Sequence, residues 1–356
     1  MEEALTAAVK PEKTDASGSS RDWYAIAKGR LDSLTKPVGS LGRLEEIAAK
    51  LVNIQQRECP RCPRKIAYVF AADHGVTSER VSAYPKAVTA QMVRNFLANG
   101  AAINILAGRA GAEVVVVDVG VDAVMESHPR LVRKKIRHGT RNLALEPAMN
   151  EKEMYAALDV GRALIEELPQ TSDQLIAVGE MGIGNTTAAS AITAALTGRS
   201  VKELTGLGTG ILPEMLLNKQ QVIERALRLH RLRSAPPLDI LRTVGGLEIA
   251  AMTGMILAAQ GRGIAVVIDG FISTAAAALA YAIDPRVTEI IFAGHLSQEA
   301  GHRVLLQYIG LDPILDLGMR LGEGTGAVLA MTVLEAAVNL FNEMATFSSA
   351  RVSGAL

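Results

Sequence analysis

Residues 66–75 read IAYVFAADHG, a short apolar run that ends at a polar pair and a glycine. Similar runs recur along the chain, at residues 113–119, 175–178, 264–268 and 289–293. They are rich in valine and isoleucine and alternate little, which indicates strands that are buried on both faces. Because alanine-rich helical stretches separate them, the sequence predicts an α/β fold, with a parallel sheet flanked by helices in a Rossmann-like three-layer arrangement.

The segment before the first run predicts helices. Apolar residues at helical spacing indicate one helix from Trp23 and another across residues 41–51, with a loop at 36–40 between them. Residues 1–20 carry few large apolar groups, and we expect a flexible lead-in there. The apolar stretches 271–283 and 327–340 are shorter than the ~20 residues that a bilayer requires, so we expect buried helices and no membrane span.

The charges balance, with 37 Lys and Arg against 37 Asp and Glu. No net field attracts nucleic acid or an anionic membrane, so neither is an expected partner. The acidic start of the chain does not resemble a secretory signal and cysteines are few, so we expect the protein in the cytoplasm. Cys59 and Cys62 have the spacing of half a zinc site or of a redox pair, but nothing completes either, and a surface turn before a strand is favoured.

Polar residues and glycines follow each apolar run. In a parallel sheet ligands bind beyond the carboxyl ends of the strands, so we expect the chemistry at these positions. They are Asp73 and His74, Asp118, residues 179–182, Asp269 with Gly270, and residues 294–297.

Two of these groups raise the question of a metal. His295 and His302 lie seven residues apart, which would place them on one face of a helix, but no third ligand stands at a recognisable spacing. A helix with two polar positions is therefore favoured. Asp73-His74 is compatible with a metal or acid–base pair and with an ordinary turn at a strand exit. We predict no metal site and no cofactor.

Two glycine-rich segments have the features of a phosphate site. Residues 182–187 read GIGNTT and precede a strong helix former, so backbone N–H groups and the helix dipole would favour an anion, although an ordinary N-cap fits equally well. The segment lacks the ending of a P-loop and matches the dinucleotide fingerprint only loosely. Residues 206–210 form another such turn, followed by Lys219, which is either a phosphate cation or, more commonly, an exposed lysine.

A carboxylate stands among three glycines in the segment 321–326, LGEGTG. The glycines let a ligand come close to Glu323, and apolar surroundings would raise its pKa by desolvation, as a general base requires. The alternative is a glutamate that interacts with the macrodipole of the following helix.

Together these segments resemble the family of nicotinate-nucleotide:dimethylbenzimidazole phosphoribosyltransferases. Six segments carry the resemblance in order, at residues 36–44, 72–76, 81–91, 179–187, 294–297 and 321–326. The resemblance implies transfer of the phosphoribosyl group of nicotinate mononucleotide to 5,6-dimethylbenzimidazole, which yields α-ribazole phosphate for the lower ligand of cobalamin. It also implies a homodimer and a small helical domain from both chain ends, here residues 21–60 with 331–356, beside a catalytic domain at 61–330.

The resemblance also implies roles for individual residues. Glu323 would be the base that deprotonates the incoming benzimidazole, with Glu180 as its acidic companion. The pocket for the aromatic base would contain Ser82, Tyr84, Gln91, Met319 and Leu321. The ribose and phosphate would be bound by Gly182, Thr186, Lys219 and Ser297.

The chemistry needs no metal, because the pyridinium ring of the donor departs neutral once its glycosidic bond breaks. Transferases that use a pyrophosphate donor usually have two adjacent acids after an apolar strand, whereas residues 114–119 contain only Asp118. Attack opposite the leaving ring predicts inversion from β to α. The remaining alternatives are a related transferase for a phenol, purine or other benzimidazole, a non-catalytic nucleotide-binding protein, and an NAD-dependent dehydrogenase, which the missing fingerprint disfavours.

Overall fold

The computed structural model describes residues 21–62, 64–171, 173–206, 208, 210 and 213–353. The predicted lead-in at 1–20 lies outside these residues, as do Leu207 and Thr209 of one glycine-rich turn.

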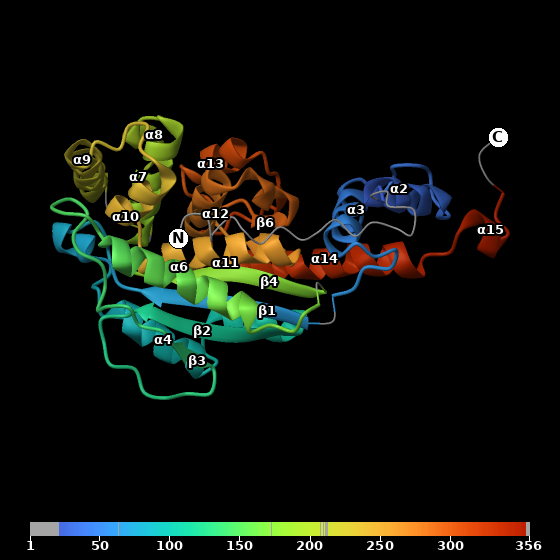
Figure 1. Ribbon diagram of the computed structural model, residues 1–356, viewed down its shortest axis with the longest axis horizontal. Coiled ribbons are helices and arrows are strands. Elements are labelled where there is room, and N and C mark those ends of the chain that lie inside the picture. Colours follow the sequence, from blue (N-terminus) through green and yellow to red (C-terminus); the bar gives the residue numbers. More distant parts are fainter. Residues whose placement is uncertain are drawn as a thin grey trace.

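A parallel sheet forms the centre of the described structure (Figure 1). Its seven strands follow the order β3-β2-β1-β4-β5-β6-β7, and every pair of neighbours runs parallel. The strands are β1 (Arg64–Ala72), β2 (Ala112–Gly120), β3 (Leu131–Arg133), β4 (Gln174–Met181), β5 (Ala265–Ile268), β6 (Ile291–His295) and β7 (Pro313–Leu315). The five predicted strands are confirmed, and the two edge strands β3 and β7 were not predicted.

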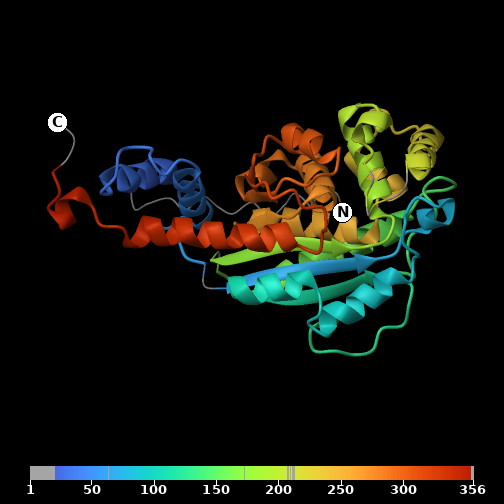
Figure 2. The ribbon, with the colours of Figure 1, turned by 180° about the vertical axis from the view of Figure 1, so that it is seen from behind.

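Helices cover both faces of the sheet, so the predicted three-layer α/β class is confirmed. Helices α11 and α12 pack on one face, with α6 along α11, while α5 and α14 pack on the other. In Figure 1, α6 and α11 lie on the side that faces the viewer. Figure 2 shows the opposite side of the molecule, with α14 in front. The helices are α2 (Trp23–Ser33), α3 (Arg43–Gln55), η1 (Gly75–Glu79), α4 (Val88–Leu97), α5 (Ala102–Ala110), α6 (Glu151–Glu166), α7 (Asn185–Thr197), α8 (Val201–Leu204), α9 (Pro213–Leu229), α10 (Pro237–Val244), α11 (Leu247–Arg262), α12 (Phe271–Ile283), η2 (Pro285–Glu289), α13 (His302–Ile309), α14 (Thr325–Glu343) and α15 (Phe347–Ala350).

The strand order reverses direction between β1 and β4. From β1 the chain first adds strands on one side, through β2 and β3, and then adds β4 to β7 on the other. The connections beyond the carboxyl ends of β1 and β4 therefore leave in opposite directions, and open α/β sheets bind their ligands near such a switch point. Asp73 and Gly182 are the residues that follow these two strand ends.

Glycines in the strands let the start of α14 lie close against the sheet. A Cβ on Gly179 of β4 would lie 2.4 Å from the backbone nitrogen of Gly324, and one on Gly294 of β6 would lie 2.8 Å from the Cα of Ala327. Neither position has room for a larger side chain. The two glycines thus place the turn that contains Glu323 on the sheet.

Both ends of the described chain pack together. Arg30 of α2 donates to the carbonyls of Phe341 and Met344, and Leu34 forms an antiparallel bridge with Thr346. Figure 2 shows α2 and α3 lying over the far end of α14. Helix α14 runs unbroken across residue 331, so the domain boundaries given above stay a prediction.

Helix α14 is also the most apolar long helix. By length and composition its 19 residues could cross a membrane, yet 56% of the apolar window is buried inside the protein. It packs on β4, β5 and β6, and also against α3 and α5. These contacts are those of a core helix, as expected for residues 327–340, and α12 matches the expected helix at 271–283.

Candidate active site

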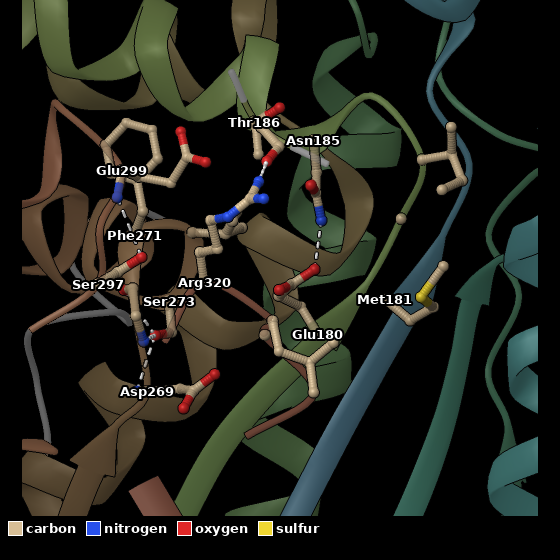
Figure 3. Close-up of a pocket in the computed structure, with 17 residues that line it drawn as sticks. Glu180, Met181, Asn185, Thr186, Asp269, Phe271, Ser273, Ser297, Glu299 and Arg320 are labelled. Atoms are coloured by element: carbon tan, nitrogen blue, oxygen red, sulfur yellow. Dashed lines mark hydrogen bonds between the residues drawn. The ribbon is translucent and has the colours of Figure 1, made fainter. Parts of the chain in front are cut away.

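A pocket opens at the carboxyl ends of β4, β5 and β6. Its walls come from five parts of the described chain, which are the turn from Glu180 to Thr186, Gly208, residues 269–273, Ser297 with Glu299, and residues 320–322. Figure 3 shows Glu180 and Asp269 on one side of this space and Arg320 with Thr186 on the other. The pocket thus has one side with two acids and another side where the cation of Arg320 and the carboxylate of Glu299 both lie.

Glu180 ends β4 on the acidic side and is 7% exposed. The side-chain amide of Asn185 donates a hydrogen bond to its carboxylate. Burial, and then the negative charges of Glu248 and Asp269, raise the pKa of Glu180 to about 8. Glu180 is therefore mostly protonated at neutral pH.

Glu323 lies in a strained turn. Its backbone has φ +64°, a conformation that side chains other than glycine rarely adopt, and the glycines on either side also have positive φ. The side chain is 5% exposed, and burial raises its pKa, as expected from the sequence. Its carboxylate accepts a hydrogen bond of 3.3 Å from the N–H of Ile103, in the first turn of α5.

That contact bears on the alternative interpretation of Glu323, a glutamate that interacts with a helix dipole. The carboxylate does face a helix start, but the helix is α5 and not the following helix α14. Glu323 lies one residue beyond the pocket wall, which Gly322 forms. A Cβ on Gly322 would lie 2.5 Å from a carboxylate oxygen of Glu180, so the turn that carries Glu323 touches Glu180 directly.

Asp269, at the end of β5, was noted only as a polar residue at a strand exit, and its role was missed. Its Oδ1 accepts hydrogen bonds from the N–H groups of Gly326 (2.6 Å) and Ala327 (3.0 Å), and Oδ2 accepts one from Gly324 (3.1 Å). Burial raises the pKa of Asp269 to about 7, against the lowering effect of these three bonds. Asp269 caps α14 from another element and fixes the turn that contains Glu323.

Lys219 lies on the opposite side of the site. The expectation of an exposed lysine is wrong, because α9 packs against α7 and leaves Lys219 only 1% exposed. Its ammonium donates a 2.8 Å hydrogen bond to the hydroxyl of Thr186, at the start of α7. Burial lowers the pKa of Lys219 to about 8, and the charge of Glu299 opposes that shift.

The turn before α7 differs from an ordinary N-cap. The N-cap residue is Gly184, with φ +97°, so neither Asn185 nor Thr186 caps the helix with its side chain. Thr186 and Gly182 line the pocket instead, and Arg320, which also lines it, donates to the carbonyl of Gly208. The start of α7 therefore faces the pocket with hydroxyl and cationic side chains beside it, an arrangement suited to an anion.

The residues expected to bind the aromatic base are less closely assembled. Leu321 lines the pocket and is 57% exposed, and Met319 lies two residues before it. Ser82, Tyr84 and Gln91 lie between η1 and α4 or within α4, away from the pocket wall, and Tyr84 is 51% exposed. Five of the predicted site residues line this pocket, namely Glu180, Gly182, Thr186, Ser297 and Leu321.

The two histidines at 295 and 302 do not share a helix, so that prediction is wrong. His295 ends β6 and accepts from the N–H of Leu317, whereas His302 begins α13. His302 accepts a 2.9 Å bond from the N–H of Ser297, and its other ring nitrogen pairs with Thr274. Burial lowers the pKa of His302 to about 3, so it is a neutral acceptor that orients Ser297 beside the pocket.

In the described part of the chain, no cluster of three or more histidine, cysteine or acidic side chains is suited to a metal. Cys59 and Cys62 are free thiols just before β1, as the interpretation of a turn before a strand implies. Burial raises the pKa of Cys62 to about 11, which makes it a poor nucleophile.

The fold is an open parallel sheet with helices on both faces, and its pocket holds buried acids beside a helix start suited to an anion. This arrangement defines the class, an α/β enzyme for small molecules. The chain belongs to the phosphoribosyltransferase family, whose sequence model matches residues 17–352. It is therefore a pentosyltransferase, and the family inferred from the six motifs is confirmed.

Several relatives carry a more specific name. The nicotinate-nucleotide–dimethylbenzimidazole phosphoribosyltransferase of Geotalea uraniireducens is 52% identical over 92% of this chain and 94% of its own. The enzyme of that name from Chlorobaculum tepidum is 48% identical over 98% and 97%. The crystal structure of CobT from Thermus thermophilus has 47% identity and a TM-score of 0.90, and the match covers 94% of this chain and all of that one.

Proposed function

We propose that this chain transfers the phosphoribosyl group of nicotinate mononucleotide to 5,6-dimethylbenzimidazole and releases nicotinate. The product, α-ribazole 5'-phosphate, would serve the assembly of the cobalamin nucleotide loop. Relatives with this name at about half identity over nearly the whole chain support the substrates. The observation that carries the chemistry is the buried Glu323, held in a strained glycine turn against Glu180.

The proposed reaction has one proton to manage. The bond between the anomeric carbon and the pyridinium nitrogen breaks, and its electron pair stays with nicotinate, which leaves neutral at that nitrogen. A ring nitrogen of the acceptor forms the new bond from the opposite face, so β becomes α. The proton on the other ring nitrogen then passes to a carboxylate, which positioning and desolvation make effective.

We assign to Glu323 the role of accepting this proton from the acceptor base. Burial raises the pKa of Glu323 above the usual range, as suits a general base, and the hydrogen bond from the N–H of Ile103 holds its carboxylate. Glu180, with its pKa of about 8, holds a proton at neutral pH and is available as a hydrogen-bond donor to substrate. The two carboxyl groups thus have environments that suit different tasks.

Substrate binding is proposed on both sides of the pocket. The phosphate and ribose lie at Gly182, Thr186, Lys219 and Ser297, supported by the hydrogen bond from Lys219 to Thr186. The acceptor base lies toward Leu321, with Met319, Ser82, Tyr84 and Gln91 completing its site. Since Tyr84 and Leu321 are more than half exposed on this chain, a homodimer that covers them is part of the proposal, as is a cytoplasmic location.

One incubation tests the activity. The protein is mixed with nicotinate mononucleotide and 5,6-dimethylbenzimidazole without added metal, and the products are separated beside α and β standards. We expect nicotinate and α-ribazole phosphate in equal amounts. Parallel reactions with adenine, a phenol and plain benzimidazole test the choice of base. If no acceptor promotes nicotinate release, the proposal fails.

A further inference from the structure

Beneath the pocket lies a buried acid–imidazole pair. His74 follows β1 and Glu248 lies in the first turn of α11, with 2.6 Å between Nε2 and Oε1 and no exposure of either side chain. The remaining polar atoms, Nδ1 of His74 and Oε2 of Glu248, are buried without hydrogen-bond partners in the described residues. Such a pair costs more to bury than apolar side chains of the same size, so a role beyond packing is expected.

Glycine contacts connect this pair to the floor of the pocket. A Cβ on Gly182, which lines the pocket, would lie 3.4 Å from Oε1 of Glu248 and 3.4 Å from the amide nitrogen of Asn185. That amide is the donor to Glu180. Glu248 and the amide that binds Glu180 therefore approach Gly182 from two elements, and Gly182 itself lines the pocket.

Three neighbouring carboxylates raise the pKa of Glu180, and they differ in the hydrogen bonds that stabilise their own negative charge. Asp269, from β5, accepts three backbone N–H bonds, and Glu323, before α14, accepts one from the start of α5. Among the described residues, Glu248, from α11, has the ring of His74 as its one side-chain hydrogen-bond partner. After burial itself, Glu248 contributes most to the raised pKa of Glu180, while Asn185, from α7, acts in the opposite direction.

We propose that Glu248, held in place by His74, is a positioning residue that keeps Glu180 protonated during catalysis and so leaves proton acceptance to Glu323. The negative charge of Glu248 disfavours a second negative charge nearby, and His74 fixes the distance at which it acts. A protonated Glu180 donates a hydrogen bond to substrate and adds no charge beside the base. This inference rests on the proposed phosphoribosyl transfer.

The test is the pH dependence of kcat with both substrates saturating. Activity is lost as the pH rises through the pKa of Glu180, which gives the wild type an alkaline limb. Glu248→Gln removes the charge but keeps the shape, so the pKa of Glu180 falls and this limb moves to lower pH by about one unit. Glu248→Asp keeps the charge and should leave the limb where it is. Saturating donor masks the separate titration of Lys219, which affects donor binding.

The outcomes separate the possibilities. A limb that stays in place in Glu248→Gln overturns the inference, and so does an equal loss at every pH, which is the mark of a structural role. If Glu248→Gln does not fold, an infrared measurement replaces the pH profile. The spectrum of Glu180→Gln is subtracted from that of the wild type, which isolates the bands of the Glu180 side chain. A protonated Glu180 at pH 7 supports the inference, and an ionised Glu180 overturns it. A wild type that releases no nicotinate would refute the proposed function, whereas the infrared result stands apart from it.

Discussion

The helices α7 and α14 begin in the same way and are used differently. Each follows a glycine with a left-handed backbone, Gly184 with φ +97° and Gly324 with φ +92°. At α14 the carboxylate of Asp269 accepts hydrogen bonds from the backbone N–H groups of the first turn. An anionic side chain of the protein itself therefore already occupies this helix start. In the described chain no carboxylate does the same at α7, where Thr186 and Lys219 lie instead.

The difference teaches how one local geometry supports two tasks. Unpaired N–H groups and the helix dipole favour negative charge at both sites. Where a carboxylate saturates them, the turn becomes a rigid support for Glu323. Where a lysine and a hydroxyl stand beside them, the turn is left for a phosphate. The following predictions test this contrast, from the largest expected effect to the smallest.

Replacing Glu323 should have the largest effect. Glu323→Gln keeps the shape but cannot accept a proton, so we expect kcat to fall by about 10²- to 10⁴-fold. The KM for nicotinate mononucleotide should change little, because Glu323 lies away from the proposed phosphate site. Steady-state kinetics measure both constants. Glu335→Gln, a partly exposed acid on α14 that pairs with Lys65, is the matched control and should retain wild-type rates.

Asp269→Asn should have the second largest effect. It weakens the hydrogen bonds that hold the turn containing Glu323 but leaves Glu323 itself in place. The amide turns an N–H donor toward at least one backbone N–H of the turn, so we expect kcat to fall about 10²-fold and stability by about 1 to 3 kcal/mol. Rates and urea unfolding measure the two effects. Asp284→Asn removes a comparable cap at η2 and should lower stability alone. Equal kcat losses in both variants would contradict the assigned support.

Lys219→Met should weaken phosphate binding at the start of α7, where the Lys219 ammonium contacts Thr186. We expect the KM for nicotinate mononucleotide to rise about tenfold with a smaller change in kcat, since a buried charge-assisted contact to phosphate is lost. The ammonium is present below its pKa of about 8, so in the wild type this KM should rise as the pH passes that value. Lys50→Met is the control, because Lys50 is also a largely buried lysine with a pKa of about 8 but belongs to α3, where its ammonium lies over the ring of Phe292.

The smallest expected effect is that of metal removal. Since the cationic ring departs neutral and the proposed phosphate contacts come from side chains and a helix start, EDTA should leave turnover unchanged. Measuring initial rates with EDTA and then with excess Mg²⁺ checks this. Loss of activity in EDTA that Mg²⁺ restores would mean that the start of α7 does not bind the phosphate unaided.

Local pattern was enough to predict the sheet but not its edges. Strands β1, β2 and β4 are buried on both faces, and their apolar runs reveal them. Strands β3 and β7 have three residues each and are only partly buried, so they leave no periodic signal. The glycines around Glu323 predicted a turn there, because the local sequence itself sets that turn, while the role of Glu323 stays a prediction.

The partners of the site residues could not be predicted, because they are distant in sequence. Asp269 lies 55 residues before Gly324, and Ile103 lies 220 residues before Glu323. Lys219 has polar neighbours along the chain and is buried only because α9 packs on α7. His295 and His302 have helical spacing, but a strand end separates them. In each case tertiary packing overrides the local signal.

The central claim is that Glu323 removes the proton from the acceptor. The most direct measurement compares transfer rates of the wild type and Glu323→Gln in single turnovers with two acceptors. 5,6-Dimethylbenzimidazole has a ring proton to lose, whereas 1,5,6-trimethylbenzimidazole has the same nucleophilic nitrogen and none. We predict a large loss in Glu323→Gln with the first acceptor and nearly equal rates of the two proteins with the second. An equal loss with both acceptors would contradict the account.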